Sequence, residues 1–235
     1  THMKRPLALA TLFCALTLTF TTAAHAATVL KVASTPTGSP FTFLDTKTNT
    51  VEGVMVDIVK AVSEKAGFEV QIEPMPFASL IGSLTSNRVD LISAAMFITP
   101  AREKVVHCSS PFYGYGEGVV VPVSDTTAYT SFAEMKGKRV GAQVGTAFVE
   151  PLQKSGLFTE VKLYETTADL MRDANAGRID VGVLDYPIAA YAINQKHFPS
   201  HHLQGDHAQQ HRHRRAQGRY RADGQDQHRT RRTQG

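Results

Sequence analysis

Arg102 lies where a side chain could bind the carboxylate of a small ligand. Thr99 and Pro100 are expected to start a helix, with Thr99 as its N-cap and proline at the first helical position. Arg102 then lies in the first turn, beside free N–H groups and the positive end of the helix dipole. A guanidinium there can hold a carboxylate through two parallel hydrogen bonds, which a lysine cannot do. The alternative is an arginine in a surface ion pair.

Asp185 and Thr146 are the other polar candidates. Asp185 follows a buried strand expected over residues 179–184, and the carboxyl end of a parallel strand is where ligands bind in open α/β sheets. Its alternative role is the N-cap of the next helix. Thr146 is expected to open a helix after a turn at Gly145, so its N–H and hydroxyl could also meet a carboxylate. An ordinary helix cap is the alternative.

The remaining candidates are apolar, and no cofactor motif accompanies them. Phe77 and Phe97 could form the wall of a pocket, although packing in the core explains such residues equally well. The sequence contains neither GxxxxGK[ST] nor HExxH, and "GYGEG" at residues 114–118 has the wrong spacing for a dinucleotide loop. Glu165, Asp169 and Asp173 are interpreted as a solvated helix face. We therefore expect no cofactor, no metal and no catalytic residue.

Strand and helix patterns alternate along the chain and would position these residues. The first series has strands at residues 29–33, 69–73 and 89–95, and helices that begin near residues 54, 77 and 99. The second has strands at residues 119–123, 139–143, 161–164 and 179–184, and helices at residues 145–154, 168–176 and 186–195. This order predicts an α/β protein of two lobes, each a mainly parallel sheet flanked by helices. A ligand cleft is expected between them.

The two ends of the chain differ from this body. Residues 1–26 combine a cloning remnant, Lys4 and Arg5, an apolar stretch and the small-x-small site "AHA", which together indicate a secretory signal peptide. Lobe 1 is then assigned to residues 27–118 and lobe 2 to residues 119–199. The formal net charge is +4, but the eight Arg and three Asp of residues 200–235 make the body mildly acidic. The body therefore gives no reason to expect a polyanion partner.

Residues 200–235 consist largely of Arg, His and Gln. Such a composition cannot bury enough apolar surface to offset the loss of chain entropy, so we expect this tail to be disordered. Codons for these residues, read one frame further, permit an amphipathic strand–turn–helix sequence, so we interpret the tail as a frameshift. The alternatives are a nucleic-acid-binding arm and a metal tract formed by His207, His211 and His213.

Five segments occur together in a recognisable order. They are "VEGVMVDIVKAV", "MPFASLIGSLTSNRVDLISAAMFITPAREK", "SSPFYGYGEGVVV", "MKGKRVGAQVGTAF" and "AGRIDVGVLDYPIAAY". Over residues 30–198 the chain resembles the bacterial extracellular solute-binding proteins of family 3, the periplasmic receptors of amino-acid ABC importers. The resemblance implies the two-lobed fold of type II periplasmic binding proteins. In that family the chain continues past residue 199 with elements that complete the first lobe, so the first lobe is expected to be incomplete here.

The resemblance also implies roles for individual residues. Arg102 would bind the ligand's α-carboxylate, Asp185 its ammonium, and Ala95 would offer a backbone carbonyl. Three positions depart from the family pattern: Thr35 replaces an Asp, Gly38 an aromatic residue, and Phe97 a Ser or Thr. The pocket should therefore be less polar than that of a receptor for basic or acidic amino acids. We expect a small neutral or apolar amino acid, or a related carboxylate, as the ligand.

The resulting hypothesis is a monomeric periplasmic receptor that delivers its ligand to a membrane permease and performs no chemistry. One alternative is an enzyme on the same scaffold, similar to cyclohexadienyl dehydratase, with Glu52 or Glu117 as the general acid. A second alternative is an arginine-rich nucleic-acid binder, although no nucleic-acid partner is expected for the body.

Overall fold

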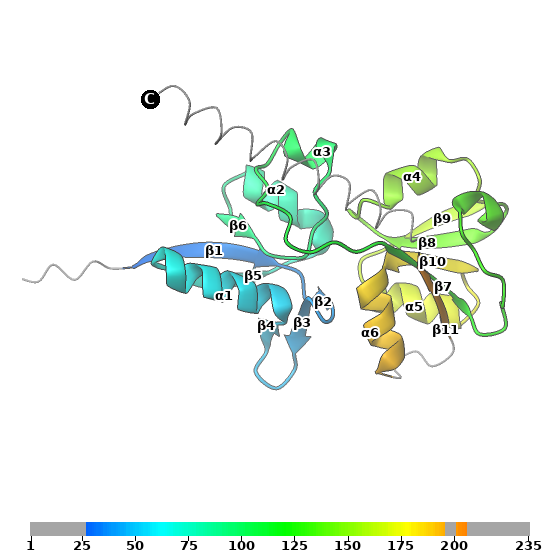
Figure 1. Ribbon diagram of the computed structural model, residues 1–235, viewed down its shortest axis with the longest axis horizontal. Helices are drawn as coiled ribbons and strands as arrows, with labels where there is room; N and C mark the ends of the chain where they lie inside the picture. Colours follow the sequence, from blue (N-terminus) through cyan, green and yellow to red (C-terminus); the bar gives the residue numbers. More distant parts are fainter. Residues whose placement is uncertain (1–26, 196–200, 206–235) are drawn as a thin grey trace, which may run out of the picture.

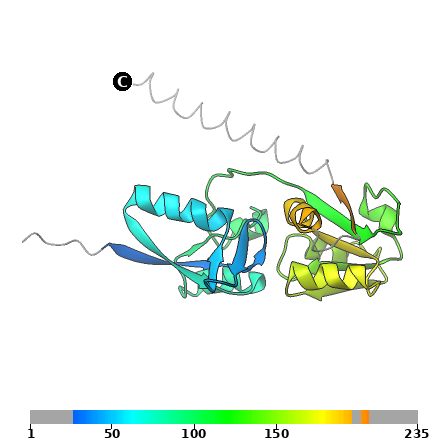
Figure 2. The same ribbon diagram turned by 90° about the horizontal axis from the view of Figure 1, so that it is seen from below.

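The chain folds into two α/β lobes that lie side by side (Figure 1). The computed structural model describes residues 27–195 and the backbone of residues 201–205. The predicted signal peptide and most of the predicted tail, including the three histidines of the metal-tract alternative, lie outside the described residues. Within the described residues, one connection, residues 104–116, leads from the first lobe into the second (Figure 2). The two-lobed α/β class predicted from the sequence is confirmed.

A parallel sheet forms the centre of the first lobe. Its middle strand is β1 (Thr28–Ser34), with β5 (Phe68–Pro74) on one side and β6 (Leu91–Ile92) on the other. The strand expected over residues 89–95 is therefore much shorter in the structure. Ala95 has a φ of 50°, a left-handed conformation that an extended strand cannot contain. The chain bends there and turns the Ala95 carbonyl toward the second lobe's connection.

Helices cover this sheet. They are α1 (Val54–Ala66), the short η1 (Phe77–Ser79), α2 (Leu80–Thr85) and α3 (Pro100–Glu103). Helix α1 packs Met55, Val56 and Val59 into the core and ends where Gly67 adopts a φ of 78°. Glycine is favoured at such a left-handed position because it has no Cβ.

A small antiparallel sheet extends from the first lobe and was not predicted. It consists of β2 (Thr37–Gly38), β3 (Thr42–Asp45) and β4 (Thr50–Glu52). Strands of two to four residues leave too few positions for an alternating pattern to be visible in sequence. The sheet matters for function because it carries Thr37 to the boundary between the lobes.

The second lobe contains a five-stranded sheet in the order β11-β7-β10-β8-β9. Strands β8 (Arg139–Gln143), β9 (Glu160–Tyr164) and β10 (Val181–Asp185) are parallel, and β7 (Glu117–Pro122) is antiparallel to β10. Its helical elements are η2 (Phe132–Met135), α4 (Val149–Lys154), α5 (Thr167–Asn175) and α6 (Tyr186–Asn194). The strands bury Val120, Val140 and Val181 completely, as expected for a sheet covered on both faces.

Strand β11 (His201–Gly205) corrects part of one prediction. Residues 200–235 were expected to be disordered, but the backbone of residues 201–205 pairs antiparallel with β7, from Pro122 to Gly118. Backbone hydrogen bonds to an open strand edge do not depend on side-chain composition, and composition was the basis of the prediction. Since β7 leads away from the first lobe, β11 directs the chain back toward it.

The described residues contain no helix that is both long and apolar enough to cross a membrane.

Candidate ligand site between the lobes

Arg102 lies at the boundary between the lobes and is held there by backbone carbonyls. Its N–H donates to the Thr99 hydroxyl at 3.3 Å, which confirms Thr99 as the cap of α3. Its Nη1 donates to the Phe97 carbonyl at 2.7 Å, and its Nη2 donates to the Gly145 carbonyl of the second lobe at 2.9 Å. No acidic side chain among the described residues forms an ion pair with it. Within the described residues, Arg102 is therefore not part of a surface ion pair.

Arg102 is partly buried. Burial lowers the pKa of its guanidinium, and the nearby Tyr115 and Asp185 partly offset this effect. The group stays charged because the pKa of arginine is far above neutral. The guanidinium carbon lies 5.9 Å from the centre of the Phe77 ring, so Phe77 forms one wall of this region. A partly buried cation without an acidic partner suits an anionic ligand.

Asp185 ends β10, as predicted, and its carboxyl group faces the same region. Asp185 is the N-cap residue of α6, but its side chain makes no capping hydrogen bond. Its carboxyl group therefore does not act as the helix cap that was considered as an alternative. Burial raises the pKa of Asp185 to about 7, while a hydrogen bond with Tyr115 and the charge of Arg102 act in the opposite direction. The site thus places a guanidinium and a carboxyl group with a raised pKa in the same region.

Tyr115 is a site residue that the sequence analysis missed. It is 7% exposed, and its hydroxyl donates to the Ala95 carbonyl at 2.6 Å. The same hydroxyl forms a hydrogen bond with the carboxyl group of Asp185. Tyr115 therefore lies between the Ala95 carbonyl, which the family resemblance offers to a ligand, and Asp185, which it assigns to the ligand's ammonium. The available signal was a large aromatic residue inside "GYGEG", a segment interpreted only as a flexible connection.

Phe97 joins the aromatic side chains of the two lobes. Its ring centre lies 4.5 Å from that of Tyr115 and 5.7 Å from that of Phe148, which precedes α4 in the second lobe. Phe97 is partly exposed and packs against two hydrophobic clusters, one that contains residues of both lobes and one that lies in the second lobe. It is therefore neither a simple core residue nor a free pocket wall, because its side chain fills the boundary and its carbonyl fixes Arg102.

Thr146 departs from its expected place. Helix α4 begins at Val149, three residues later than predicted, so Thr146 lies in the preceding turn and does not open the helix. Its hydroxyl and its N–H both donate to the Gln143 carbonyl, at 2.7 and 3.3 Å. Val149 is β-branched and Pro151 lacks an N–H, which favours a late helix start. The Thr146 hydroxyl proton is thus already used within the turn.

Thr37 forms a second polar contact between the lobes, also missed from sequence. Its carbonyl accepts a hydrogen bond from the Thr167 hydroxyl at 2.8 Å, and its hydroxyl accepts one from Gln143 Nε2 at 3.3 Å. Gln143 is buried and also donates to the Glu165 carbonyl. These contacts join β2 of the first lobe to β8 and α5 of the second.

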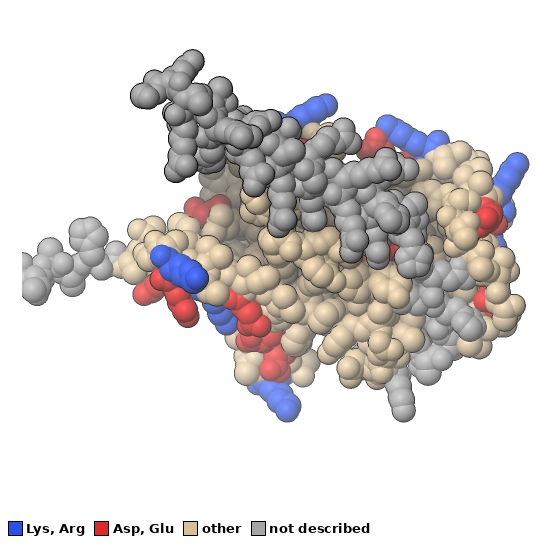
Figure 3. All heavy atoms as spheres, viewed as in Figure 1, with Lys and Arg blue, Asp and Glu red and all other residues tan. Residues whose placement is uncertain are grey.

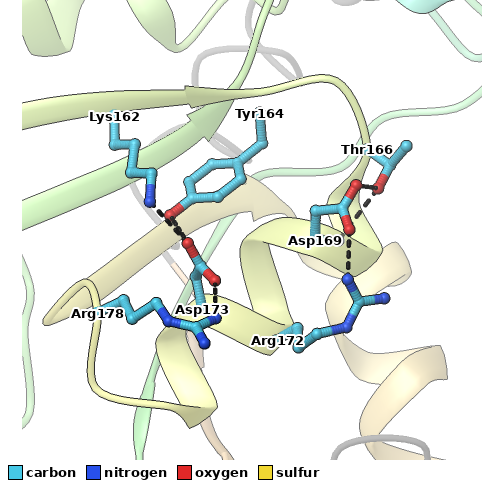
Figure 4. A network of polar contacts seen from close by, with 7 residues as sticks. All are labelled: Lys162, Tyr164, Thr166, Asp169, Arg172, Asp173 and Arg178. Atoms are coloured by element: carbon cyan, nitrogen blue, oxygen red, sulfur yellow. Dashed lines mark hydrogen bonds and ion pairs between the residues drawn. The ribbon is translucent and has the colours of Figure 1, made fainter.

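The acidic face of α5 is only partly the solvated face that was predicted. Asp173 accepts hydrogen bonds from Lys162 Nζ and Arg178 Nη1, both at 2.8 Å, and from the Tyr164 hydroxyl at 2.9 Å (Figure 4). These three donors hold the pKa of Asp173 below its usual range. Asp169 pairs with Arg172, while Glu165 is exposed. The network connects α5 to β9 and lies outside the ligand site.

On the face shown in Figure 3, the described Lys and Arg side chains are scattered among Asp and Glu side chains and form no continuous basic surface. Within the described ranges, no three His, Cys, Asp or Glu residues are grouped as a metal site would require.

Two α/β lobes joined by one described segment have, at their boundary, a carboxyl group and an arginine that forms no ion pair within the described residues, an arrangement typical of two-lobed proteins that bind small ligands. The family comparison is more specific: residues 30–190 match the bacterial extracellular solute-binding proteins, family 3. The chain belongs to this family, so the resemblance drawn from its motifs is confirmed.

The relatives are amino-acid-binding proteins of transporters. The chain is similar to ABC transporter arginine-binding protein 1 of Escherichia coli (strain K12), at 32% identity over 71% of this chain and 67% of that protein. It spans 54 to 68% of the length of three such curated relatives. Among solved structures, an ancestral arginine-binding protein bound to arginine is similar, with a TM-score of 0.70, 29% identity, and coverage of 77% of this chain and 80% of that one.

The comparisons favour binding over catalysis. One similar structure is an ancestral amino acid-binding protein that is a precursor of cyclohexadienyl dehydratase, with a TM-score of 0.67, 26% identity, and coverage of 75% of this chain and 76% of that one. It is itself described as a binding protein. Of the two glutamates named for an enzyme, Glu52 accepts a hydrogen bond from Thr50 on β4, and Glu117 is buried in β7.

Proposed function

We propose that this protein is the solute-binding receptor of an ABC importer and captures an amino acid or a similar small carboxylate between its lobes. One observation carries the proposal: the guanidinium of Arg102 lies at the lobe boundary without an acidic partner among the described residues. Two of its N–H groups donate to the carbonyls of Phe97 and Gly145, and a guanidinium has five such groups. The others are left for a carboxylate.

The remaining predicted residues have supporting roles in this proposal. Thr99 caps α3 and fixes the backbone of Arg102, while Phe77 and Phe97 shield the guanidinium from water. Thr146 can contribute its hydroxyl oxygen to ligand binding, or its turn can position the Gly145 carbonyl that binds Arg102. Asp185 and the Ala95 carbonyl face the opposite end of the ligand. Charge-assisted hydrogen bonds in such a shielded place are stronger than at the surface.

Calorimetric titration tests the proposal. The full chain is titrated with the twenty amino acids and with their analogues that lack the ammonium group. Replacing Arg102 with Ala should weaken the binding of any carboxylate ligand by about a hundredfold, because a hydrogen bond to a charged group contributes roughly 1.5–3 kcal/mol. Arg172→Ala is the matched control, since Arg172 pairs with Asp169 on the surface of α5. Binding that Arg102→Ala leaves unchanged would contradict the proposal.

The cellular setting follows from the family and the sequence. We propose export to the periplasm through the signal peptide of residues 1–26, a monomeric state, and docking of the ligand-bound protein on a membrane permease. Secretion of a fusion to a periplasmic reporter tests export, and light scattering tests the monomeric state. Retention of the fusion in the cytoplasm, or a stable dimer, would contradict the respective point.

A further inference from the structure

Under the proposed function, Asp185 and the Ala95 carbonyl face the end of the ligand that carries an ammonium, and Tyr115 lies between these two groups. Its hydroxyl donates to the Ala95 carbonyl at 2.6 Å, and its interaction with Asp185 affects the pKa of both side chains. Among the described residues, no other side chain donates a hydrogen bond to the Ala95 carbonyl or to the Asp185 carboxyl group. An ammonium bound to both acceptors would thus compete with this hydroxyl for the same positions.

The ring of Tyr115 is fixed firmly, so the hydroxyl cannot easily leave. Its centre lies 4.5 Å from the ring of Phe97, 5.5 Å from that of Phe41 and 5.7 Å from that of Tyr113. Tyr115 is 7% exposed and belongs to the cluster that includes Leu184 and Ile188. Displacement would sacrifice this burial and these ring contacts, each of which favours the observed position.

The hydrogen bonds around Tyr115 can be satisfied without a cation. Tyr115 donates its only hydroxyl proton to the Ala95 carbonyl, and its oxygen can accept a proton from Asp185 when that carboxyl group is protonated. Each group then has a partner, so none of the three requires a ligand donor. At the other end of the site the guanidinium of Arg102 still requires an anion.

We propose that Tyr115 determines specificity and that the site selects small carboxylates without an ammonium group. The tyrosine hydroxyl takes the place of the ammonium, and the ligand contributes only its carboxylate and an apolar body. This inference rests on the proposed function, because it takes Arg102 as the carboxylate-binding residue. It narrows the substrate class from amino acids to their counterparts that lack the ammonium.

Matched ligand pairs test the inference by calorimetry on the full chain. The pairs are phenylalanine with 3-phenylpropanoate, leucine with 4-methylpentanoate, and arginine with 5-guanidinopentanoate, whose members differ only in the ammonium group. Wild-type protein should bind the second member of at least one pair about tenfold more tightly than the first. Tyr115→Ser should reverse this preference, because it opens space and exposes Asp185 and the Ala95 carbonyl to an ammonium.

A second variant keeps the ring in case Tyr115→Ser does not fold. Tyr115→Phe removes only the hydroxyl, so the preference against the ammonium should fall by about tenfold. Tyr113→Phe is the matched control, because Tyr113 is 56% exposed and its hydroxyl is not recorded at either acceptor. The control should keep the wild-type preference.

The outcomes separate this inference from the proposed function. Tighter binding of the amino acid by wild-type protein, lost in Arg102→Ala, would overturn the inference and leave the receptor function standing. An unchanged preference in Tyr115→Phe would also overturn the inference. Absence of binding of every pair to wild type and to both Tyr115 variants would count against both.

Discussion

At the scale of single residues, Asp185 should make stability depend on pH. Burial raises its pKa from 3.8 to about 7, so the folded protein favours the protonated form. The stabilisation is fully present below pH 4 and is lost as the pH rises toward 7, because the unfolded chain ionises first. Over this window Asp185 should lower the free energy of unfolding by at most about 4 kcal/mol. Asp185→Asn should remove this decline, measured by denaturant unfolding at about pH 5 and pH 8.

Asp125 provides a control of opposite sign. Burial alone would raise its pKa, but hydrogen bonds from Tyr129 and Thr127 and the charge of Lys138 outweigh it and lower the pKa to about 2. Its contribution is present above pH 4 and is lost as the pH falls toward 2. Asp125→Asn should therefore leave the change between pH 5 and pH 8 as in wild type. An equal change in wild type and Asp185→Asn would refute the assignment to Asp185.

Residue types and local position predicted Arg102 and Asp185 as site residues, but they did not predict Tyr115. The cap at Thr99 and the end of a strand at Asp185 are local features, so Arg102 and Asp185 could be placed from sequence. Tyr115 acts through contacts with residues 20 and 70 positions away, Ala95 and Asp185. No local pattern reports such contacts. Thr37 and Gln143, which meet across 106 positions, were missed for the same reason.

At the scale of elements, the start of α5 depends on its cap. The Thr166 hydroxyl accepts a hydrogen bond from the Asp169 N–H at 3.0 Å and donates to the Asp169 carboxylate at 2.7 Å (Figure 4). Thr166→Ala should lower the free energy of unfolding by about 1 kcal/mol, because it leaves a helix N–H without its partner. Denaturant unfolding measures the effect, and Thr166→Ser, which keeps the hydroxyl, should remain within about 0.5 kcal/mol of wild type. Equal losses in both variants would show that the methyl group, rather than the cap, is responsible.

Elements with a long or fully buried pattern were predicted well. Helix α1, with its glycine stop, and strands β8, β9 and β10 lie where their periodicity placed them. The sheet of β2, β3 and β4 and the late start of α4 were missed. They depend on turn geometry and on pairing between short segments, which hydrophobic periodicity does not record.

At the scale of the whole molecule, the two lobes meet through polar and aromatic contacts as well as a hydrophobic cluster that contains residues of both. Arg102 reaches the Gly145 carbonyl, Phe97 meets Phe148, and Thr37 meets Gln143 and Thr167. Binding proteins with hinged lobes enclose their ligands by bringing such surfaces together. The free energy of ligand binding should therefore depend on how closely the lobes can approach.

Gly145 tests this dependence, because a side chain added there would meet the backbone of the first lobe. A Cβ on Gly145 would lie 2.7 Å from the Cα of Ala78, which belongs to η1 of the first lobe. Gly145→Ala should therefore hold the lobes apart and weaken ligand binding by at least about tenfold, measured by calorimetry.

Gly156→Ala is the control for backbone strain. Gly145 has a φ of 81°, so an alanine there is strained; Gly156 has a φ of 65°, and no atom lies within 4 Å of a Cβ added to it. Both variants should lose about 1 kcal/mol of stability, but only Gly145→Ala should lose affinity and show a larger radius of gyration in solution scattering. Similar affinity in the two variants would mean that approach of the lobes at Gly145 does not control binding.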